Sequence, residues 1–168
     1  VSTDIPRTLD GIRQGVLDCR CAVAWLAGRP EVDAEKLGMI GTSLGSFLTA
    51  LTSANEPRIK AVTVSATCLE PGGHTIFEEA SPTFKMRFMY MSGYTDEAAF
   101  DQFVKTLTWE GYAEKITTPM LVVHGGKDVI TPMDNATRLM KEARGEIETL
   151  IWDDSMHCCH DRSHIVRP

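Results

Sequence analysis

The chain has 168 residues, of which 43% are hydrophobic and 24% are charged, enough for one globular domain with a buried core. Its formal net charge of −6 argues against nucleic acid or an anionic membrane surface as a partner, since both attract basic proteins. No apolar run approaches the roughly 20 residues that span a bilayer. The five cysteines have no spacing typical of a disulfide framework, so we expect reduced thiols and a cytoplasmic protein.

Short apolar segments alternate with helical patterns along the chain. Helices are predicted from apolar residues at intervals of three and four, and they cover residues 2–30, 44–54 and 132–144. Four segments have the composition of buried strands, and they cover residues 37–40, 60–66, 120–124 and 146–152. Strands without polar alternation, separated by helices, indicate a parallel sheet covered on both faces. The predicted fold class is therefore α/β, a three-layer α/β/α sandwich.

Residues 70–118 interrupt this alternation within what we predict to be a single domain, residues 1–168. The segment is rich in aromatic residues and methionine and predicts two or three helices, one of them starting at Thr95. It is interpreted as a helical cap-like insertion over a pocket, or alternatively as a long crossover that packs on the sheet. Two candidate substrate contacts lie in it. They are His74 and Glu79, and a pocket-facing Glu79 would favour a cationic or amine-bearing substrate.

The sequence Gly41-Thr42-Ser43-Leu44-Gly45 joins the first strand to the helix that follows it. This fits the G-x-S-x-G nucleophile elbow, in which a sharp turn projects the serine oxygen above the carboxyl edge of the sheet. Glycines two residues on either side would let strand and helix approach closely. The N–H of Leu44, at a helix N-terminus, would stabilise a developing oxyanion. The alternative is a structural turn whose serine caps the helix.

A serine hydroxyl needs a base that is itself oriented by an acid. The elbow predicts the chain order serine, acid, histidine, with each residue in a loop after a strand. Asp128 follows the strand at 120–124 and His157 follows the strand at 146–152, so both order and placement agree. We therefore predict Ser43 as nucleophile, Asp128 as orienting acid and His157 as general base.

The segments "GTSLGS", "TPMLVVHGGKDVITP" and "MHCCHD" resemble the α/β-hydrolase superfamily. More narrowly, "LTWEGYAEKITTPMLVVHGGKD" and "HCCHDRSHIVRP" are similar to capped hydrolases related to dihydropseudooxynicotine hydrolase and to the fermentation-respiration-switch esterases. The resemblance implies the same three roles for Ser43, Asp128 and His157. It also implies that strands before the elbow, including the source of a second oxyanion donor, are missing from this chain. We expect an incomplete α/β-hydrolase fold that pairs with an N-terminal part or with a homodimer partner.

The function predicted from these observations is hydrolysis of a carboxylic ester, a small-molecule substrate, through an acyl-enzyme. Two alternatives stay open. One is hydrolysis of a carbon–carbon bond in a ketone, which the resemblance implies, and the other is a catalytically silent subunit with the same fold. No cofactor is expected, because the phosphate-binding glycine motifs are incomplete. A metal site at residues 157–160 is not expected either, since adjacent cysteines point apart and no second pair has zinc-like spacing.

Overall fold

The computed structural model describes residues 5–67, 82–106 and 111–166, and a sheet of four parallel strands lies at its centre. The strands are β1 (Gly38–Thr42), β2 (Ala61–Ser65), β3 (Met120–Gly125) and β4 (Ile147–Trp152). Their order in the sheet is β1-β2-β3-β4, the same as in the chain. The four predicted strands are thus confirmed to within two residues at either end. Because they are parallel, the segments that follow them all leave from one edge of the sheet.

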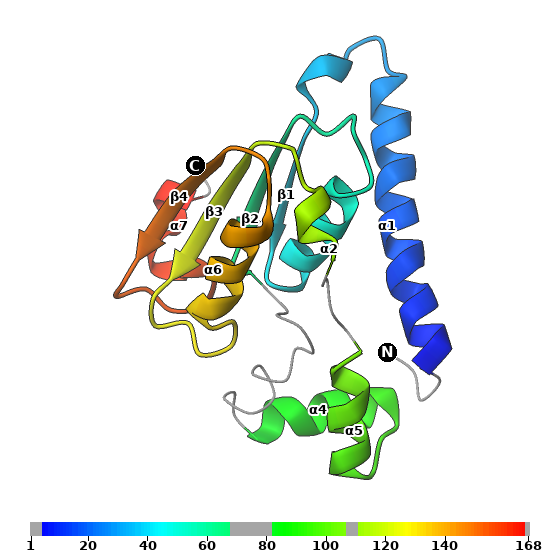
Figure 1. Cartoon of the computed structure of the whole chain (residues 1–168), viewed down its shortest axis with the longest axis vertical. Coiled ribbons are helices and arrows are strands. Elements are labelled where there is room, and N and C mark those ends of the chain that lie inside the picture. Colours follow the sequence, from blue (N-terminus) through cyan, green and yellow to red (C-terminus); the bar gives the residue numbers. More distant parts are fainter. Residues whose placement is uncertain (1–4, 68–81, 107–110, 167–168) are drawn as a thin grey trace.

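Helices precede, connect and follow these strands. They are α1 (Ile5–Ala27), η1 (Ala34–Lys36), α2 (Leu44–Ser53), α4 (Pro82–Ser92), α5 (Glu97–Val104), η2 (Ala113–Lys115), α6 (Met133–Glu142), η3 (His157–Arg162) and α7 (Ser163–Val166). Figure 1 shows α2 and α6 on one side of the sheet with α1 beside α2, and α7 on the other side. Within the described residues, no helix combines the length and hydropathy needed to cross a bilayer.

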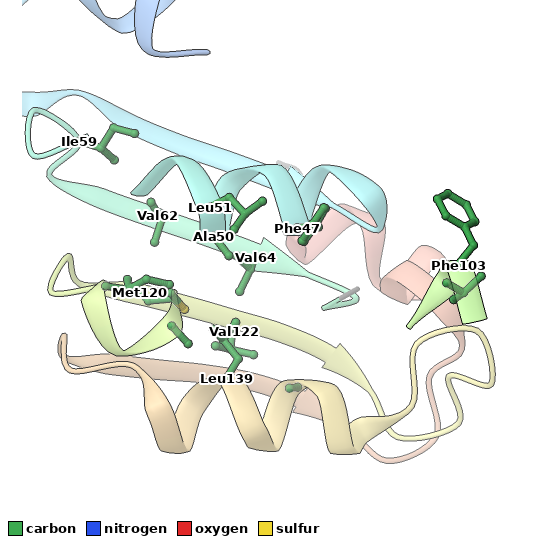
Figure 2. Close-up of a cluster of buried hydrophobic side chains, with 14 of the residues drawn as sticks. Phe47, Ala50, Leu51, Ile59, Val62, Val64, Phe103, Met120, Val122 and Leu139 are labelled. Carbon is green, nitrogen blue, oxygen red and sulfur yellow. The ribbon is translucent and has the colours of Figure 1, made fainter. Parts of the chain in front are cut away.

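The main core lies between the sheet and the layer formed by α2 and α6 (Figure 2). Val62, Val64 and Val122 of the central strands are at most 3% exposed. They pack with apolar residues of α2 and α6, among them Leu51 and Leu139. Burial of side chains of this size stabilises the fold by about 1.5–3 kcal/mol each, so the two central strands form the rigid base on which the connecting loops are placed.

The opposite face of the sheet is covered only in part by the described residues. Val123 of β3 is 1% exposed on this face, whereas Ile40 of β1 is 62% exposed and Leu150 of β4 is 37% exposed. β1 and β4 are the two edge strands. The prediction of a sheet covered on both faces is thus met at its centre, and it is not met at its edges within the described residues.

The described part of the 70–118 segment contains α4 and α5. Lys85 of α4 forms ion pairs of 2.7 Å with both Glu97 and Asp101 of α5. Tyr94 and Phe103 stack with their ring centroids 5.2 Å apart. The ion pairs join the two helices, and the stacked rings fix the connection between them on α5. Figure 1 places both helices beyond the carboxyl ends of the strands.

Candidate active site

The turn from β1 to α2 has a strained backbone at Ser43. Its φ of 53° and ψ of −122° lie in a region that residues with a side chain rarely adopt. The Ser43 N–H donates a hydrogen bond of 2.9 Å to the carbonyl of Ser65, which continues the β1-β2 ladder past the last residue of β1. A Cβ on Gly41 would overlap the Gly45 carbonyl and the Thr49 side chain. The chain can therefore make this turn only with glycine at position 41.

The second glycine of the motif does not have the predicted steric role. A Cβ on Gly45 would meet no heavy atom within 4 Å in the described structure. The close approach of strand and helix therefore depends on Gly41 alone. The prediction that both glycines relieve a clash is wrong for Gly45, because a Cβ at this position of α2 would meet none of the described atoms of β1.

The Ser43 hydroxyl forms no capping hydrogen bond to α2. Its oxygen lies 3.1 Å from His157 Nε2 instead. A serine that served only to cap the helix would accept a hydrogen bond from the first turn, so the structure contradicts the capping alternative. The next residue, Leu44, is the first residue of α2, and its side chain is 59% exposed.

His157 joins Ser43 to Asp128. Its Nδ1 lies 2.8 Å from Asp128 Oδ2, while its Nε2 faces the serine. A carboxylate only accepts hydrogen bonds, so Nδ1 carries the proton and Nε2 is left as an acceptor for the serine hydroxyl. The structure thus brings together three side chains that are 114 and 29 positions apart in the chain.

Asp128 is buried, with no exposed side-chain surface. Burial alone would raise the pKa of this carboxyl group. Hydrogen bonds from His157 and Thr131 outweigh that effect, so the pKa of Asp128 is lowered from its ordinary value. The group is therefore an anion at neutral pH, and an anion beside Nδ1 favours the tautomer described above.

A close approach between two loops sets the position of His157. A Cβ on Gly125, at the end of β3, would overlap the carbonyl oxygens of Ser155 and Met156. The Lys127 N–H also donates a 2.9 Å hydrogen bond to the Ser155 carbonyl. The loops that follow β3 and β4 are thus in direct contact, and this places the histidine beside the aspartate.

Two residues next to the site were not among the predicted site residues. Thr131 is fully buried and donates a 2.6 Å hydrogen bond from its hydroxyl to Asp128 Oδ2. His124 is also fully buried, with Nε2 2.8 Å from the Thr131 carbonyl. The available signal for Thr131 was its spacing, since an aspartate often accepts hydrogen bonds from the residues two and three positions later.

The sequence also drew attention to His74, Glu79 and residues 157–160. His74 and Glu79 lie outside the described residues. His160 is exposed, while Cys158 and Cys159 are buried. In the described ranges, no group of three or more histidine, cysteine, aspartate or glutamate side chains is placed to hold a metal ion.

A sequence model of the prolyl oligopeptidase family matches residues 12–167, nearly the whole chain. The chain belongs to this family. Membership of the prolyl oligopeptidase family agrees with a serine at the elbow and a histidine in the loop after β4, because this is a family of serine hydrolases. No curated protein matches the chain.

Solved structures identify the fold. The 2,6-dihydroxy-pseudo-oxynicotine hydrolase is similar with a TM-score of 0.69 and 20% identity over 84% of this chain and 40% of its own. Acetyl xylan esterase 1 from Thermoanaerobacterium sp. JW/SL YS485 is similar with a TM-score of 0.68 and 17% identity, and the match covers 84% of this chain and 46% of the esterase. The acylaminoacyl peptidase of Pyrococcus horikoshii is similar with a TM-score of 0.63 and 17% identity, and the match covers 84% of this chain and 22% of the peptidase. The fold is that of the α/β-hydrolases, and this prolyl oligopeptidase family chain spans less than half the length of each of these structures.

Proposed function

We propose that this chain carries the catalytic residues of a serine esterase that cleaves a carboxylic ester through an acyl-enzyme. The observation that supports the proposal is the relay from Asp128 through His157 to Ser43, with separations of 2.8 and 3.1 Å. These separations are within the reach that proton transfer requires. Membership of a serine hydrolase family supports the same reaction class.

In this mechanism His157 Nε2 takes the proton of the Ser43 hydroxyl as the oxygen attacks the carbonyl carbon. The Asp128 carboxylate stabilises the imidazolium that forms. The Leu44 N–H, at the N-terminus of α2, donates to the oxyanion. His157 then returns the proton to the leaving alkoxide, and the same histidine activates a water molecule that releases the acyl group.

Exposed apolar side chains next to all three residues support a substrate with an apolar group. Leu44 follows Ser43, Val129 follows Asp128, and Met156 precedes His157. These three side chains are 59%, 53% and 55% exposed, respectively. Exposed apolar side chains beside the reacting groups favour an apolar acyl or alcohol group. Helices α4 and α5 lie beyond the same edge of the sheet (Figure 1), which supports a cap role for residues 70–118.

A second candidate is hydrolysis of a peptide or amide bond, which the family match favours, since the matching family is named for an oligopeptidase. The nucleophile and the acyl-enzyme would be the same, and only the leaving group would differ. Hydrolysis of a carbon–carbon bond in a ketone stays a prediction, because no contact among the described residues favours it.

The test is covalent labelling with a fluorophosphonate at neutral pH, followed by hydrolysis of p-nitrophenyl acetate, butyrate and octanoate and of aminoacyl p-nitroanilides. We expect labelling that is lost in Ser43→Ala and kept in Ser163→Ala, a matched control at an exposed serine that begins α7. Faster hydrolysis of the esters supports the esterase, and faster hydrolysis of the anilides supports the peptidase. A wild-type protein that is not labelled would contradict both and favour a silent subunit.

A further inference from the structure

The Asp128 carboxylate accepts hydrogen bonds at both of its oxygens. Oδ1 accepts from the Ile130 N–H at 2.9 Å and from the Thr131 N–H at 2.8 Å. Oδ2 accepts from the Thr131 hydroxyl at 2.6 Å and from His157 Nδ1 at 2.8 Å. Among the described residues, Thr131 alone donates to both oxygens, so it restricts rotation of the carboxylate about its last bond.

The Thr131 hydroxyl also lies close to His157. Its Oγ1 is 3.4 Å from Nδ1, the atom that faces Asp128. Hydrogen bonds to a charged group are stronger than those between neutral groups. The Thr131 hydroxyl donates at 2.6 Å to Asp128 Oδ2, the same oxygen that accepts from His157 Nδ1. Loss of the hydroxyl would leave Oδ2 with one donor and let the carboxylate turn away from the ring.

His124 holds Thr131 in place from the other side. His124 is fully buried on β3, and burial lowers its pKa, so the ring is neutral. Its Nε2 lies 2.8 Å from the Thr131 carbonyl, and a carbonyl only accepts, so the Nε2–H donates. The residues after β3 are thereby tied back to the strand at the point where Thr131 contacts Asp128.

We propose that Thr131 is a positioning residue of the active site, whose hydroxyl holds the Asp128 carboxylate in line with His157. The proposal rests on the proposed serine hydrolase function. A threonine with only a structural role would affect stability, whereas a positioning residue affects the rate at which Ser43 reacts. The hydroxyl, rather than the size of the side chain, carries this role.

The experiment compares wild-type protein with Thr131→Val, which keeps the shape and removes the hydroxyl, and with Thr131→Ser, which keeps the hydroxyl. The rate of labelling by a fluorophosphonate, kcat and KM for the best ester, and the thermal unfolding midpoint are measured for each. Thr131→Val should lower the labelling rate and kcat about tenfold with KM unchanged, and Thr131→Ser should stay within about threefold of wild type. Thr131→Ala serves as the hydroxyl-free variant if the valine variant does not fold.

Two results would overturn this inference while the proposed function stands. One is a wild-type rate of labelling in the hydroxyl-free variant. The other is an equal loss in the valine and serine variants, which would show that packing alone matters. A wild-type protein that is not labelled would instead overturn the proposed function, and this inference with it.

Discussion

Glu56, far from the candidate active site in the turn between α2 and β2, should make the stability of the protein depend on pH. Its side chain is 2% exposed and forms ion pairs of 2.6 Å with Arg58 and 3.4 Å with Arg20 of α1. The hydrogen bond from the Arg58 side chain is the main cause that lowers the pKa of Glu56 from 4.5 to about 2, and burial opposes it. This carboxylate therefore joins α1 to the rest of the fold.

The size of the effect follows from these two pKa values. A carboxyl whose pKa is 4.5 in the unfolded chain and about 2 in the folded one stabilises the fold by at most about 3 kcal/mol at pH 7. The side chains of both arginines are about two-fifths exposed, so solvent screens the pairs and we expect about 1–2 kcal/mol. Because the folded pKa is depressed, the contribution is complete above pH 4.5 and is lost as the pH falls toward 2. About two-fifths of it is gone at pH 3.5.

The assay is urea unfolding of wild type and Glu56→Gln at pH 7, 5 and 3.5. The matched control is Glu35→Gln, which removes an 83% exposed carboxylate that pairs with Lys60 at 3.2 Å. We expect the Glu56 variant to lose about 1–2 kcal/mol at pH 7, with a smaller difference at pH 3.5, and the control to lose less than about 0.5 kcal/mol. A difference at Glu56 that matches the control, or that stays constant down to pH 3.5, would refute the reasoning.

Two further predictions concern the candidate active site. Asp128→Asn should lower kcat by about 10⁴-fold with little change in KM, because it removes the anion that selects the tautomer of His157. Steady-state kinetics on the best ester measures this effect, and a loss of kcat below tenfold would contradict the prediction. Gly125→Ala should destabilise the fold and slow labelling of the serine, because its Cβ would overlap the loop that carries His157, whereas Gly45→Ala should change the unfolding midpoint little.

The convergence of Ser43, Asp128 and His157 could be predicted because two simple regularities determine it. Apolar runs mark the buried strands, and parallel strands present their following loops at one edge of the sheet. Three polar residues that each follow such a strand must therefore lie at the same edge. The hydrogen bonds that join them depend on loop conformations, which no periodic pattern describes, and only coordinates give them.

Thr131 and the start of α5 show what the sequence left open. Thr131 lies in a short loop where several turns could form, and its contact with Asp128 depends on which turn the buried carboxylate selects. At α5 the sequence indicated Thr95 as the helix start, but Asp96 is the capping residue and accepts a 2.7 Å hydrogen bond from the Ala99 N–H. Both side chains are good helix caps, so local chemistry alone did not distinguish neighbouring positions.

Backbone strain in the described ranges is concentrated around the candidate active site. The non-glycine residues with positive φ there are Ser43, Ala66, Cys158 and Cys159. Ser43 and Ala66 directly follow β1 and β2, and the two cysteines directly follow His157. Conformations of this kind cost about 1–3 kcal/mol each and persist only where the surroundings enforce them.

Hydrogen bonds to the sheet hold two of these residues in their strained conformations. The Ser43 N–H bonds to the Ser65 carbonyl at 2.9 Å, and the Ala66 N–H bonds to the Val123 carbonyl at 3.0 Å. Each strained residue thus keeps one hydrogen bond to the next strand, and the buried core of β2 and β3 stabilises both. A serine held in this way cannot relax toward the helix-capping position, so its hydroxyl stays directed at His157. The same core burial that stabilises the fold therefore also maintains the geometry on which the proposed reaction depends.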